Sequence, residues 1–420
     1  MEKLVIEGGK SLKGEVYISG SKNSALPIMA ATLLTDEPCT LVNVPALRDT
    51  KTMGKLLVSL GKKVEFKDNT VVISNSEKIS HIAEYDLVST MRGSFCVLGP
   101  LLAKLNKAKV SLPGGCVIGV RPVDIHLKGL KALGAKIDIE NGYVLAHCKQ
   151  LKGTQIYLGG IFGSSVLATA NILMAAVLAQ GKTYIESAAC EPEIEDLANM
   201  LIAMGADIQG HGSPRIVVKG VKKLRGVKYR VIPDRIEAGT YILLAAVTNS
   251  DITIKNAEYS HLFSLIDALA QVGIKVKKTK TGMKIIKKHK LQPVSLTTLP
   301  YPGFPTDLQA QFLTLMAMTP GVSVITEKVY PDRFIHIAEL NRMGANIRRE
   351  GANSIVQGVK SLIGAPVMAS DLRASAALVM AGLAAKGKTE IHRIYHLERG
   401  YESLDEKLLA LGAKVYREDN

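Results

Sequence analysis

A glycine-rich loop carries a thiol in a setting that favours reactivity. Cys116 lies in Pro113-Gly-Gly-Cys-Val-Ile-Gly-Val-Arg-Pro-Val-Asp124, between a predicted strand and a predicted helix. On such a loop, beside Arg121, a thiol is expected to be partly exposed and in a positive field, which lowers its pKa. Local sequence leaves open whether Cys116 is functional or a bystander. The other cysteines lack that setting and are expected to be inert: Cys39, Cys96, Cys148 and Cys190.

Several cations stand at loop or helix-start positions and predict an anion site. Lys22 and Asn23 lie in a turn directly before an apolar helix. There a point charge would add to free backbone N–H groups and the positive helix end, as in phosphate sites. An N-cap with a solvated lysine is the alternative interpretation of this stretch. The other cations would, if they converge, neutralise a phosphate and a carboxylate: Arg92, Arg121, Arg373 and Arg399.

Carboxylates accompany these cations at three places. The segments are Pro305-Thr-Asp-Leu-Gln309, Ser370-Asp-Leu-Arg-Ala-Ser375 and Glu398-Arg-Gly-Tyr-Glu402. Each precedes a predicted helix, so any one of these residues could simply be a helix cap. The combination of carboxylates with cations favours a functional role for Asp307 and Asp371.

A motif that occurs six times predicts the elements that position these residues. It reads apolar-Gly-x-x-Val/Ile, and each copy follows a helical pattern, so each glycine is expected to end a helix in the left-handed conformation before a strand. A second helix and an alternating strand lie upstream, which gives a βαβαββ unit of about 70 residues. Chance recurrence of a common turn is the alternative. Three units sharing one core would form each of two domains. The glycines are Gly61, Gly134, Gly205, Gly273, Gly344 and Gly412.

Composition narrows the class of protein. With 420 residues, 47% of them hydrophobic and 22% charged, the chain has ample material for a folded core. Five cysteines without a C-x-x-C pair predict neither a disulfide framework nor a zinc ribbon, and we expect a reducing cytoplasmic location. The start of the chain has no apolar stretch of signal-peptide length, and residues 166–179 read as a buried helix rather than a membrane span.

The net charge of +15 predicts an anionic partner. Eight lysines between Lys275 and Lys290, with no acid among them, suggest nucleic acid. Tryptophan is absent and aromatic residues make up only 5%, so stacking platforms are not evident and a solvated hairpin face is the better interpretation. We therefore expect no nucleic-acid partner, and a small phosphate as the bound anion.

At these residues the chain resembles the enolpyruvyl transferases, specifically their sugar-nucleotide branch, over its whole length. The sister family that makes enolpyruvyl-shikimate phosphate shares the six-unit plan but lacks the Pro-Gly-Gly-Cys loop. The most specific motifs are Ser21-Lys-Asn-Ser-Ala25, Ser111-Leu-Pro-Gly-Gly-Cys116, Gly119-Val-Arg-Pro-Val-Asp124, Pro233-Asp-Arg-Ile-Glu237, Phe304-Pro-Thr-Asp-Leu-Gln-Ala310, Asp371-Leu-Arg-Ala-Ser375 and Arg393-Ile-Tyr-His-Leu-Glu-Arg-Gly-Tyr-Glu402.

The resemblance implies an α/β fold, a two-domain inside-out α/β barrel in which each domain has three βαβαββ units. One domain would comprise residues 21–233 and carry the Cys116 loop. The other would comprise residues 1–20 plus 234–420. The active site would lie in the cleft between them, and two chain crossings would suit a clamp that closes on substrate.

The implied reaction transfers the enolpyruvyl group of phosphoenolpyruvate to the 3′-hydroxyl of UDP-N-acetylglucosamine and releases phosphate, the first committed step of peptidoglycan precursor synthesis. By residue-wise similarity, Cys116 is the general acid, Asp307 is the base, and Asp371 is coupled to closure. Phosphoenolpyruvate contacts would come from Lys22, Arg92, Arg121, Arg373 and Arg399. Sugar-nucleotide contacts would come from Asn23, Arg92, Arg121, Pro122, Val123, Asp124, Ser165, Val166, Asp307 and Val329.

The implied chemistry needs no metal and no cofactor, because guanidinium and ammonium groups supply the positive charge. Membrane insertion is not expected, and no protein partner is predicted. One departure concerns Leu167, which stands where the family usually has glycine. A side chain there would hinder close approach of a diphosphate to backbone N–H groups. The alternative function is therefore a silent paralogue that binds a sugar nucleotide and regulates an active partner.

A first test concerns Cys116. We expect Cys116→Ser to lose most turnover or product release, because a serine hydroxyl is a much weaker acid than a thiol. A thiol-alkylating epoxide analogue of phosphoenolpyruvate, of the fosfomycin kind, should inactivate the unmodified protein. Full activity after stoichiometric labelling of Cys116 would contradict its role.

Overall fold

In a computed structural model of the 420-residue chain, all six repeat glycines have positive φ, from 86° at Gly412 to 107° at Gly205. They follow helices and precede strands, as predicted. At Gly134 a Cβ atom would meet nothing within 4 Å, so the backbone conformation, not crowding, calls for glycine there. The structure describes residues 2–76, 78–114, 123–286 and 291–419. Cys116, Arg121 and Pro122 therefore lie outside the described residues.

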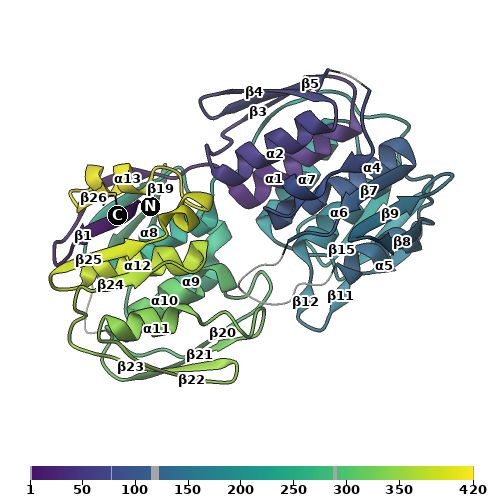
Figure 1. The fold of residues 1–420 in the computed structure, drawn as a ribbon. Helices are drawn as coiled ribbons and strands as arrows, with labels where there is room; N and C mark the ends of the chain where they lie inside the picture. Colours follow the sequence, from purple (N-terminus) through teal and green to yellow (C-terminus); the bar gives the residue numbers. More distant parts are fainter. Residues whose placement is uncertain (1, 77, 115–122, 287–290, 420) are drawn as a thin grey trace. The chain divides into compact units, whose positions relative to one another are not determined.

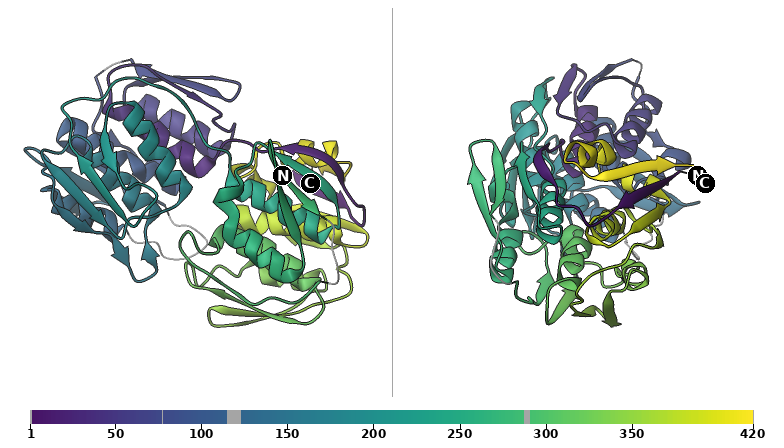
Figure 2. Two further views of the ribbon diagram at one scale, coloured as in Figure 1. Left: turned by 180° about the vertical axis from the view of Figure 1, so that it is seen from behind. Right: turned by 90° about the vertical axis from the view of Figure 1, so that its left-hand side faces the viewer.

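Contacts divide the described chain into two units. Of the described residues, 20–114 and 123–232 form the central unit. Residues 2–19 and 233–419 form the terminal unit, in which β1 (Lys3–Glu7) pairs with β26 (Lys414–Glu418), so the two ends of the chain lie side by side (Figures 1 and 2).

The central unit contains three four-stranded sheets and a two-stranded hairpin (Figure 1). The sheets are β16-β3-β5-β4, β6-β7-β9-β8 and β10-β13-β15-β14. The strands are β3 (Cys39–Val42), β4 (Lys62–Lys67), β5 (Thr70–Asn75), β6 (Ile82–Ala83), β7 (Lys107–Ser111), β8 (Lys136–Glu140), β9 (Tyr143–His147), β10 (Gln155–Tyr157), β13 (Lys182–Glu186), β14 (Asp207–Gln209), β15 (Arg215–Lys219) and β16 (Lys228–Arg230), with the hairpin β11 (Gly159–Gly160) and β12 (Gly163–Ser164). The helices are α1 (Lys22–Ala31), η1 (Thr32–Leu34), α2 (Arg48–Ser59), α3 (Tyr85–Val88), η2 (Arg92–Val97), α4 (Leu98–Leu105), α5 (Asp124–Ala132), α6 (Val166–Ala176) and α7 (Pro192–Ala203).

The terminal unit has the same plan. Its sheets are β2-β17-β19-β18, β20-β21-β23-β22 and β24-β25-β1-β26. The further strands are β2 (Lys13–Tyr17), β17 (Asp251–Lys255), β18 (Lys275–Thr279), β19 (Gly282–Ile286), β20 (Leu296–Thr298), β21 (Val322–Glu327), β22 (Asn346–Glu350), β23 (Asn353–Gln357), β24 (Pro366–Met368) and β25 (Lys388–His392). The helices are α8 (Arg235–Val247), η3 (Tyr259–Leu262), α9 (Phe263–Val272), η4 (Thr306–Leu308), α10 (Gln309–Ala317), α11 (His336–Arg342), α12 (Leu372–Ala384), η5 (Ile394–Arg399) and α13 (Leu404–Ala410).

The six sheets confirm the predicted βαβαββ units. In each sheet the first two strands of the unit are parallel, as β10 and β13 are. The last two form an antiparallel pair, as β14 and β15 do, and the final strand pairs antiparallel with the second strand, as β15 does with β13. Three sheets are completed by strands that are distant in sequence. Strand β16 is the first strand of the unit that contains β3, and β2 is the first strand of the unit that contains β17. Strand β1 is the last strand of the unit that contains β26. The repeat motif did not predict these three exchanges.

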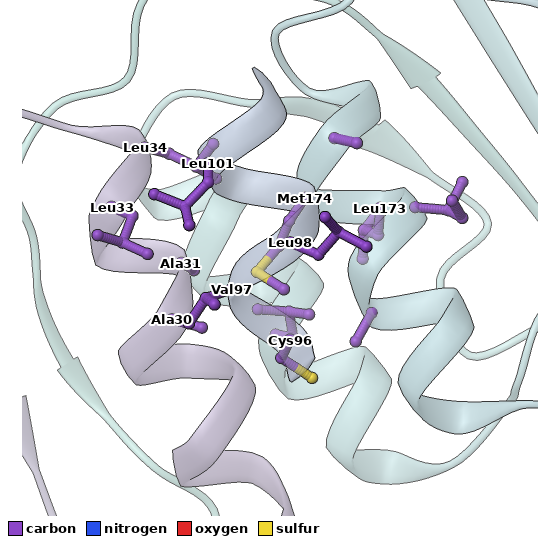
Figure 3. Packing of buried hydrophobic residues seen from close by; sticks show 14 of the residues in the cluster. Ala30, Ala31, Leu33, Leu34, Cys96, Val97, Leu98, Leu101, Leu173 and Met174 are labelled. Carbon is purple, nitrogen blue, oxygen red and sulfur yellow. The ribbon is translucent and has the colours of Figure 1, made fainter. Parts of the chain in front are cut away.

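Helices form the interior of each unit. In the central unit α6 packs on both α1 and α4, and α1 packs on η2, which leads into α4. Figure 3 shows Ala30 and Ala31 of α1, Leu98 of α4 and Met174 of α6 among the residues of this core. In the terminal unit α8, α10 and α12 pack on one another. These helices are buried on almost every side, which accords with the predicted buried helix at residues 166–179. Among the described residues, no helix combines the length and apolar character of a membrane span.

The described cysteines and the lysine-rich hairpin match their predictions. Burial raises the pKa of the Cys96 thiol to about 12, which leaves it protonated and unreactive at neutral pH. Cys39 is also buried, whereas Cys148 and Cys190 are only partly so, and burial raises the thiol pKa of all three. The described lysines of β18 and β19 lie on exposed positions, and Lys284 pairs with Asp251 at 3.2 Å.

A stability test follows from the left-handed glycines. We expect Gly412→Ala to lower the free energy of unfolding by about 1 kcal/mol, because a Cβ disfavours that backbone conformation although it meets no neighbour. Urea unfolding measures the change. Gly412→Asn is the matched control and should cost less, because asparagine tolerates the left-handed region. An equal or smaller loss for alanine than for asparagine would contradict the interpretation.

Candidate active site

Asp307 lies at the centre of a charged cluster in the terminal unit. It belongs to η4, and its two carboxylate oxygens contact two arginines: Arg333 Nη1 at 2.7 Å and Arg373 Nη2 at 3.1 Å. Both guanidinium groups are almost completely buried, whereas the Asp307 side chain is 26% exposed. The carboxylate is thus held on its inner side by two cations, and part of it remains accessible to a ligand.

Arg333 also links Asp307 to Asp371. Its Nη2 lies 3.7 Å from Asp371 Oδ1, and that same oxygen accepts hydrogen bonds from the backbone N–H groups of Arg373 and Ala374. Asp371 is therefore the N-cap of α12, as the structural alternative predicted, and an ion-pair partner as well. Burial alone would lower the pKa of Arg333, but the carboxylates of Asp307 and Asp371 raise it above its usual value. Arg333 therefore stays charged at neutral pH.

Sequence reasoning missed Arg333. The residue follows Pro331 and Asp332 after strand β21, and the same Pro-Asp-Arg triplet opens the motif Pro233-Asp-Arg-Ile-Glu237. Arg235 is also almost completely buried and lies over the Tyr301 ring at 5.4 Å. The repeated triplet is the sequence signal that could have identified Arg333 as a candidate. Its burial then calls for a nearby carboxylate, because a buried arginine needs a partner of opposite charge.

The loop that contains Val329 is held by a buried carboxylate. Glu327 Oε1 accepts hydrogen bonds from the N–H groups of Val329 and Tyr330, both at 2.9 Å, and from the hydroxyl of Thr298 at 2.6 Å. Its Oε2 accepts from Thr306, the residue before Asp307, at 2.9 Å. Glu327 therefore connects the predicted contact Val329 to the start of η4.

Arg399 is the last residue of η5, which packs against α12. Nearby in sequence, the buried Tyr401 hydroxyl is 2.9 Å from Thr240 Oγ1 and accepts from Gln311 Nε2 at 3.2 Å, and its ring lies 5.4 Å from the Arg373 guanidinium. The structure thus brings Asp307, Asp371 and Arg373 into direct contact and places Arg399 on an element beside them.

In the central unit Lys22 is buried at the first turn of α1. Its ammonium nitrogen lies 3.4 Å from Asp49 Oδ2 on α2, and Ser21 caps the helix by accepting from the Ser24 N–H. The alternative of a solvated lysine is therefore wrong. Asn23 is half-buried beside it. The buried ammonium group therefore places a positive charge at the start of α1.

A buried carboxylate fixes the start of α1. Asp196 of α7 accepts from the hydroxyl groups of Ser24 and Tyr229, the latter at 2.6 Å, and from the N–H of Ile232 at 3.2 Å. The N–H of Ser21 in turn donates to the Ile232 carbonyl at 2.7 Å. Burial raises the pKa of Asp196. This network joins the Lys22 turn to the end of the central unit.

The other described candidates also stand at the starts of helical segments. Arg92 begins η2 and is half-buried, and Asp124 is the exposed first residue of α5, preceded by Val123. Ser165 is the N-cap of α6 and accepts from Ala168 N–H, and Val166 is the first residue of that helix. Four helical starts of the central unit, those of α1, η2, α5 and α6, therefore carry Lys22, Arg92, Val123 to Asp124, and Ser165 to Val166.

Leu167, the residue that departs from the family pattern, is half-buried in the first turn of α6. It packs against the hydrophobic core of the central unit. A part of its side chain is thus directed to the core and not to the helix start. Within the ranges that the structure describes, no group of three or more His, Cys, Asp or Glu side chains is placed to hold a metal ion.

The comparisons with a protein family and with individual proteins give consistent results. Residues 6–408 match the family EPSP synthase (3-phosphoshikimate 1-carboxyvinyltransferase). The chain is 52% identical over 417 residues to the UDP-N-acetylglucosamine 1-carboxyvinyltransferase of Desulfosudis oleivorans, and the match covers 99% of both chains. It is 53% identical over 416 residues to the protein of the same name from Endomicrobium trichonymphae, again over 99% of each.

A solved structure extends the likeness to the fold. The enolpyruvyl transferase NikO from Streptomyces tendae has a TM-score of 0.89 at 25% identity, and the alignment covers 99% of this chain and 98% of that one. The overall fold is therefore retained where three quarters of the residues differ.

The charged cluster around Asp307 makes a stability prediction. We expect Arg333→Met to lower the free energy of unfolding by about 3 kcal/mol, because it leaves Asp371 buried without its cation. Arg348→Met is the matched control. It removes an exposed pair with Glu350 at 2.9 Å and should cost less than about 1 kcal/mol. Urea unfolding of both variants checks the difference, and equal losses would show that Arg333 contributes no more than a surface ion pair.

Proposed function

Because the chain belongs to the EPSP synthase family of enolpyruvyl transferases, we propose that it transfers the enolpyruvyl group of phosphoenolpyruvate to the 3′-hydroxyl of UDP-N-acetylglucosamine. The observation that carries the proposal is about 50% identity, over essentially the whole chain, to relatives named for that reaction. The product leads into peptidoglycan synthesis. The two units are the proposed enolpyruvyl-transferase domains, residues 21–233 and residues 1–20 plus 234–420.

Addition comes first. The sugar 3′-oxygen forms a bond to C2 of phosphoenolpyruvate, the hydroxyl proton passes to Asp307, and the methylene carbon receives a proton from Cys116 and becomes a methyl group. Asp307 suits the role of base because its carboxylate is partly exposed and its position is set by two buried arginines. Two fixed ion pairs limit the rotation of the carboxylate, so its orientation needs little rearrangement during the reaction.

Elimination completes the transfer. The methyl group returns a proton to the Cys116 thiolate that the addition step left, and the double bond re-forms. The bond between C2 and the phosphate oxygen breaks, with the electron pair leaving on phosphate. Cations that hold the phosphate stabilise this charge as it develops. We assign that task to Lys22, Arg121 and Arg399, with Arg92 and Arg373 in support. Guanidinium and ammonium groups supply the charge, and we propose that the reaction uses no metal and no cofactor.

We propose that the sugar nucleotide contacts the helical starts of the central unit and two points of the terminal unit. Support comes from the exposed or half-buried positions of these residues and from the free N–H groups of a helix start such as that of α6. The proposed contacts are Asn23, Arg92, Arg121, Pro122, Val123, Asp124, Ser165, Val166, Asp307 and Val329. Arg121 and Pro122 rest on the sequence motif alone.

Asp371 is the proposed closure residue. It combines two tasks, since it caps α12 and pairs with Arg333, so a movement of α12 would be transmitted to the arginine that holds Asp307. The proposed location is the cytoplasm, which the free cysteines of the described chain support. The silent-paralogue alternative rests on Leu167 alone, and the partial packing of Leu167 into the core weakens it.

Phosphate release tests the function. With phosphoenolpyruvate, the folded protein should release phosphate only when UDP-N-acetylglucosamine is present. We expect Asp307→Asn to lower kcat about 10²-fold or more, because an amide cannot take up the hydroxyl proton. Asp332→Asn, an exposed aspartate of the same unit, is the control and should retain activity. Sugar-independent release, or none from folded protein, would overturn the function, whereas an active Asp307→Asn would remove only the base assignment.

A further inference from the structure

A fully buried amide interrupts the apolar helix α6. Asn171 has no exposed surface, and its neighbours along the helix include Ala170, Ile172 and Leu173, all buried. Burying an amide among apolar groups is unfavourable by several kcal/mol unless its hydrogen bonds are made. The partners of Asn171 therefore indicate what the residue is for.

Those partners come from three other helical segments. Asn171 Oδ1 accepts from the N–H of Gly99 in α4 at 2.7 Å, and Nδ2 donates to the carbonyl of Phe95 in η2 at 3.0 Å. Nδ2 also lies 2.9 Å from Nδ1 of His126 in α5. Because only the amide oxygen can accept from Gly99, the nitrogen must face His126, whose Nδ1 is then the acceptor. The imidazole is neutral, with its proton on Nε2.

His126 remains neutral for two physical reasons. Burial disfavours the imidazolium, and the positive charge of Arg92 adds to the effect, so the pKa of His126 falls to about 3. The Phe95 ring meets the imidazole edge-on, with centroids 5.2 Å apart and planes at 77°. Asn171 Nδ2 therefore remains the donor, and His126 Nδ1 the acceptor, of this hydrogen bond throughout the physiological pH range.

The node formed by Asn171 and His126 has little freedom to shift, since the helices approach closely there. A Cβ on Gly99 would lie 2.2 Å from the Asn171 carbonyl oxygen, and a Cβ on Gly129 of α5 would lie 2.6 Å from Ile172 Cδ1. Figure 3 shows the packing of η2, α4 and α6 in this region, with Cys96, Leu98 and Leu173 directed into the core. Close packing and saturated hydrogen bonds together define one arrangement.

Three of the four segments joined at this node carry a proposed contact to the sugar nucleotide at their starts. Segment η2 begins with Arg92, α5 with Asp124, and α6 with Val166. We propose that Asn171 and His126 are positioning residues that hold these three starts in the arrangement that binds UDP-N-acetylglucosamine, an inference that rests on the proposed function. They touch no substrate and act through the helices they join.

The proposal predicts a loss of sugar-nucleotide affinity without a matching loss of chemistry. Asn171→Ala removes three hydrogen bonds and frees the helices to shift, and displacements of about 1 Å are enough to weaken binding strongly. By calorimetry we expect the Kd for UDP-N-acetylglucosamine to rise about 10-fold, with KM following and kcat changing less.

Thr169→Val is the matched control. Thr169 is a buried polar residue of the same helix, and its hydroxyl accepts one hydrogen bond, from the N–H of Ala189 at 3.0 Å. Residue 189 carries no proposed contact. Thr169→Val should lower stability and leave the Kd within about 2-fold of the starting value. If both variants change Kd equally, Asn171 is merely structural and the proposal is overturned.

Asn171→Asp preserves the shape of the side chain, so it can test the proposal even if Asn171→Ala fails to fold. Its carboxylate would face His126 Nδ1 and stabilise the imidazolium, so the pKa of His126 should rise. Imidazole NMR signals should show no titration of His126 between about pH 5.5 and 8 in the unchanged protein, and a titration there in the variant. The Kd of Asn171→Asp should then depend on pH. A His126 that titrates without the substitution, or a variant with unchanged Kd, contradicts the proposal.

Direct binding separates this proposal from the proposed function. Binding of UDP-N-acetylglucosamine without sugar-dependent phosphate release would contradict the reaction and leave the positioning role to be judged by the Kd values. Failure of the unchanged protein to bind the sugar nucleotide would overturn both.

Discussion

The interior helices of each unit are the constraint on which the remaining structure depends. Helices α1, α4 and α6, and likewise α8, α10 and α12, are apolar on nearly all sides. In the central unit α6 packs on α1 and α4, and in the terminal unit the three helices pack on one another, so only the helix ends can carry groups that meet a ligand. Their positive N-terminal ends also suit an anionic ligand. The sheets cover the outer sides of these helices. Chemistry is therefore confined to helix starts and the loops beside them, where almost every described candidate residue lies.

Charged side chains buried at these helix starts need partners of opposite charge, and these partners fix the positions of the side chains. Arg333 and Arg373 hold Asp307 from the inner side, and Asp49 accompanies Lys22. Pairs of this kind contribute little net stability, because desolvation offsets much of the attraction. Their effect is to fix the direction of each charge. Ion pairs hold the carboxylate in one orientation, and a buried amide holds the helix starts in place. Both kinds of contact give a site that needs little rearrangement when substrate binds.

The six repeats share a fold but not a function. Each supplies a parallel strand pair, two helices and a hairpin, and the glycine after the second helix is the same in all. Side chains at the helix starts differ from repeat to repeat, from Lys22 to Ser165 and Asp371. Strands β1 and β16 each complete a sheet that begins elsewhere in the sequence. The repeats thus provide equivalent positions, and individual substitutions at those positions provide the chemistry.

The sequence by itself determined the repeat, the βαβαββ order and the types of residue at the helix starts, because turn glycines and hydrophobic periodicity are local properties. It also pointed to Asp307, Asp371 and Arg373. Only the tertiary structure decided that Arg333 joins two of them and that Lys22 is buried. It also decided that β1, β2 and β16 complete sheets whose other strands are distant in sequence, and that Asn171 links four helical segments. The contacts of Asp307 with Arg333 and Arg373 span 26 and 66 positions, and that of Asn171 with Phe95 spans 76. Contacts over such separations depend on how helices pack, which no local pattern encodes.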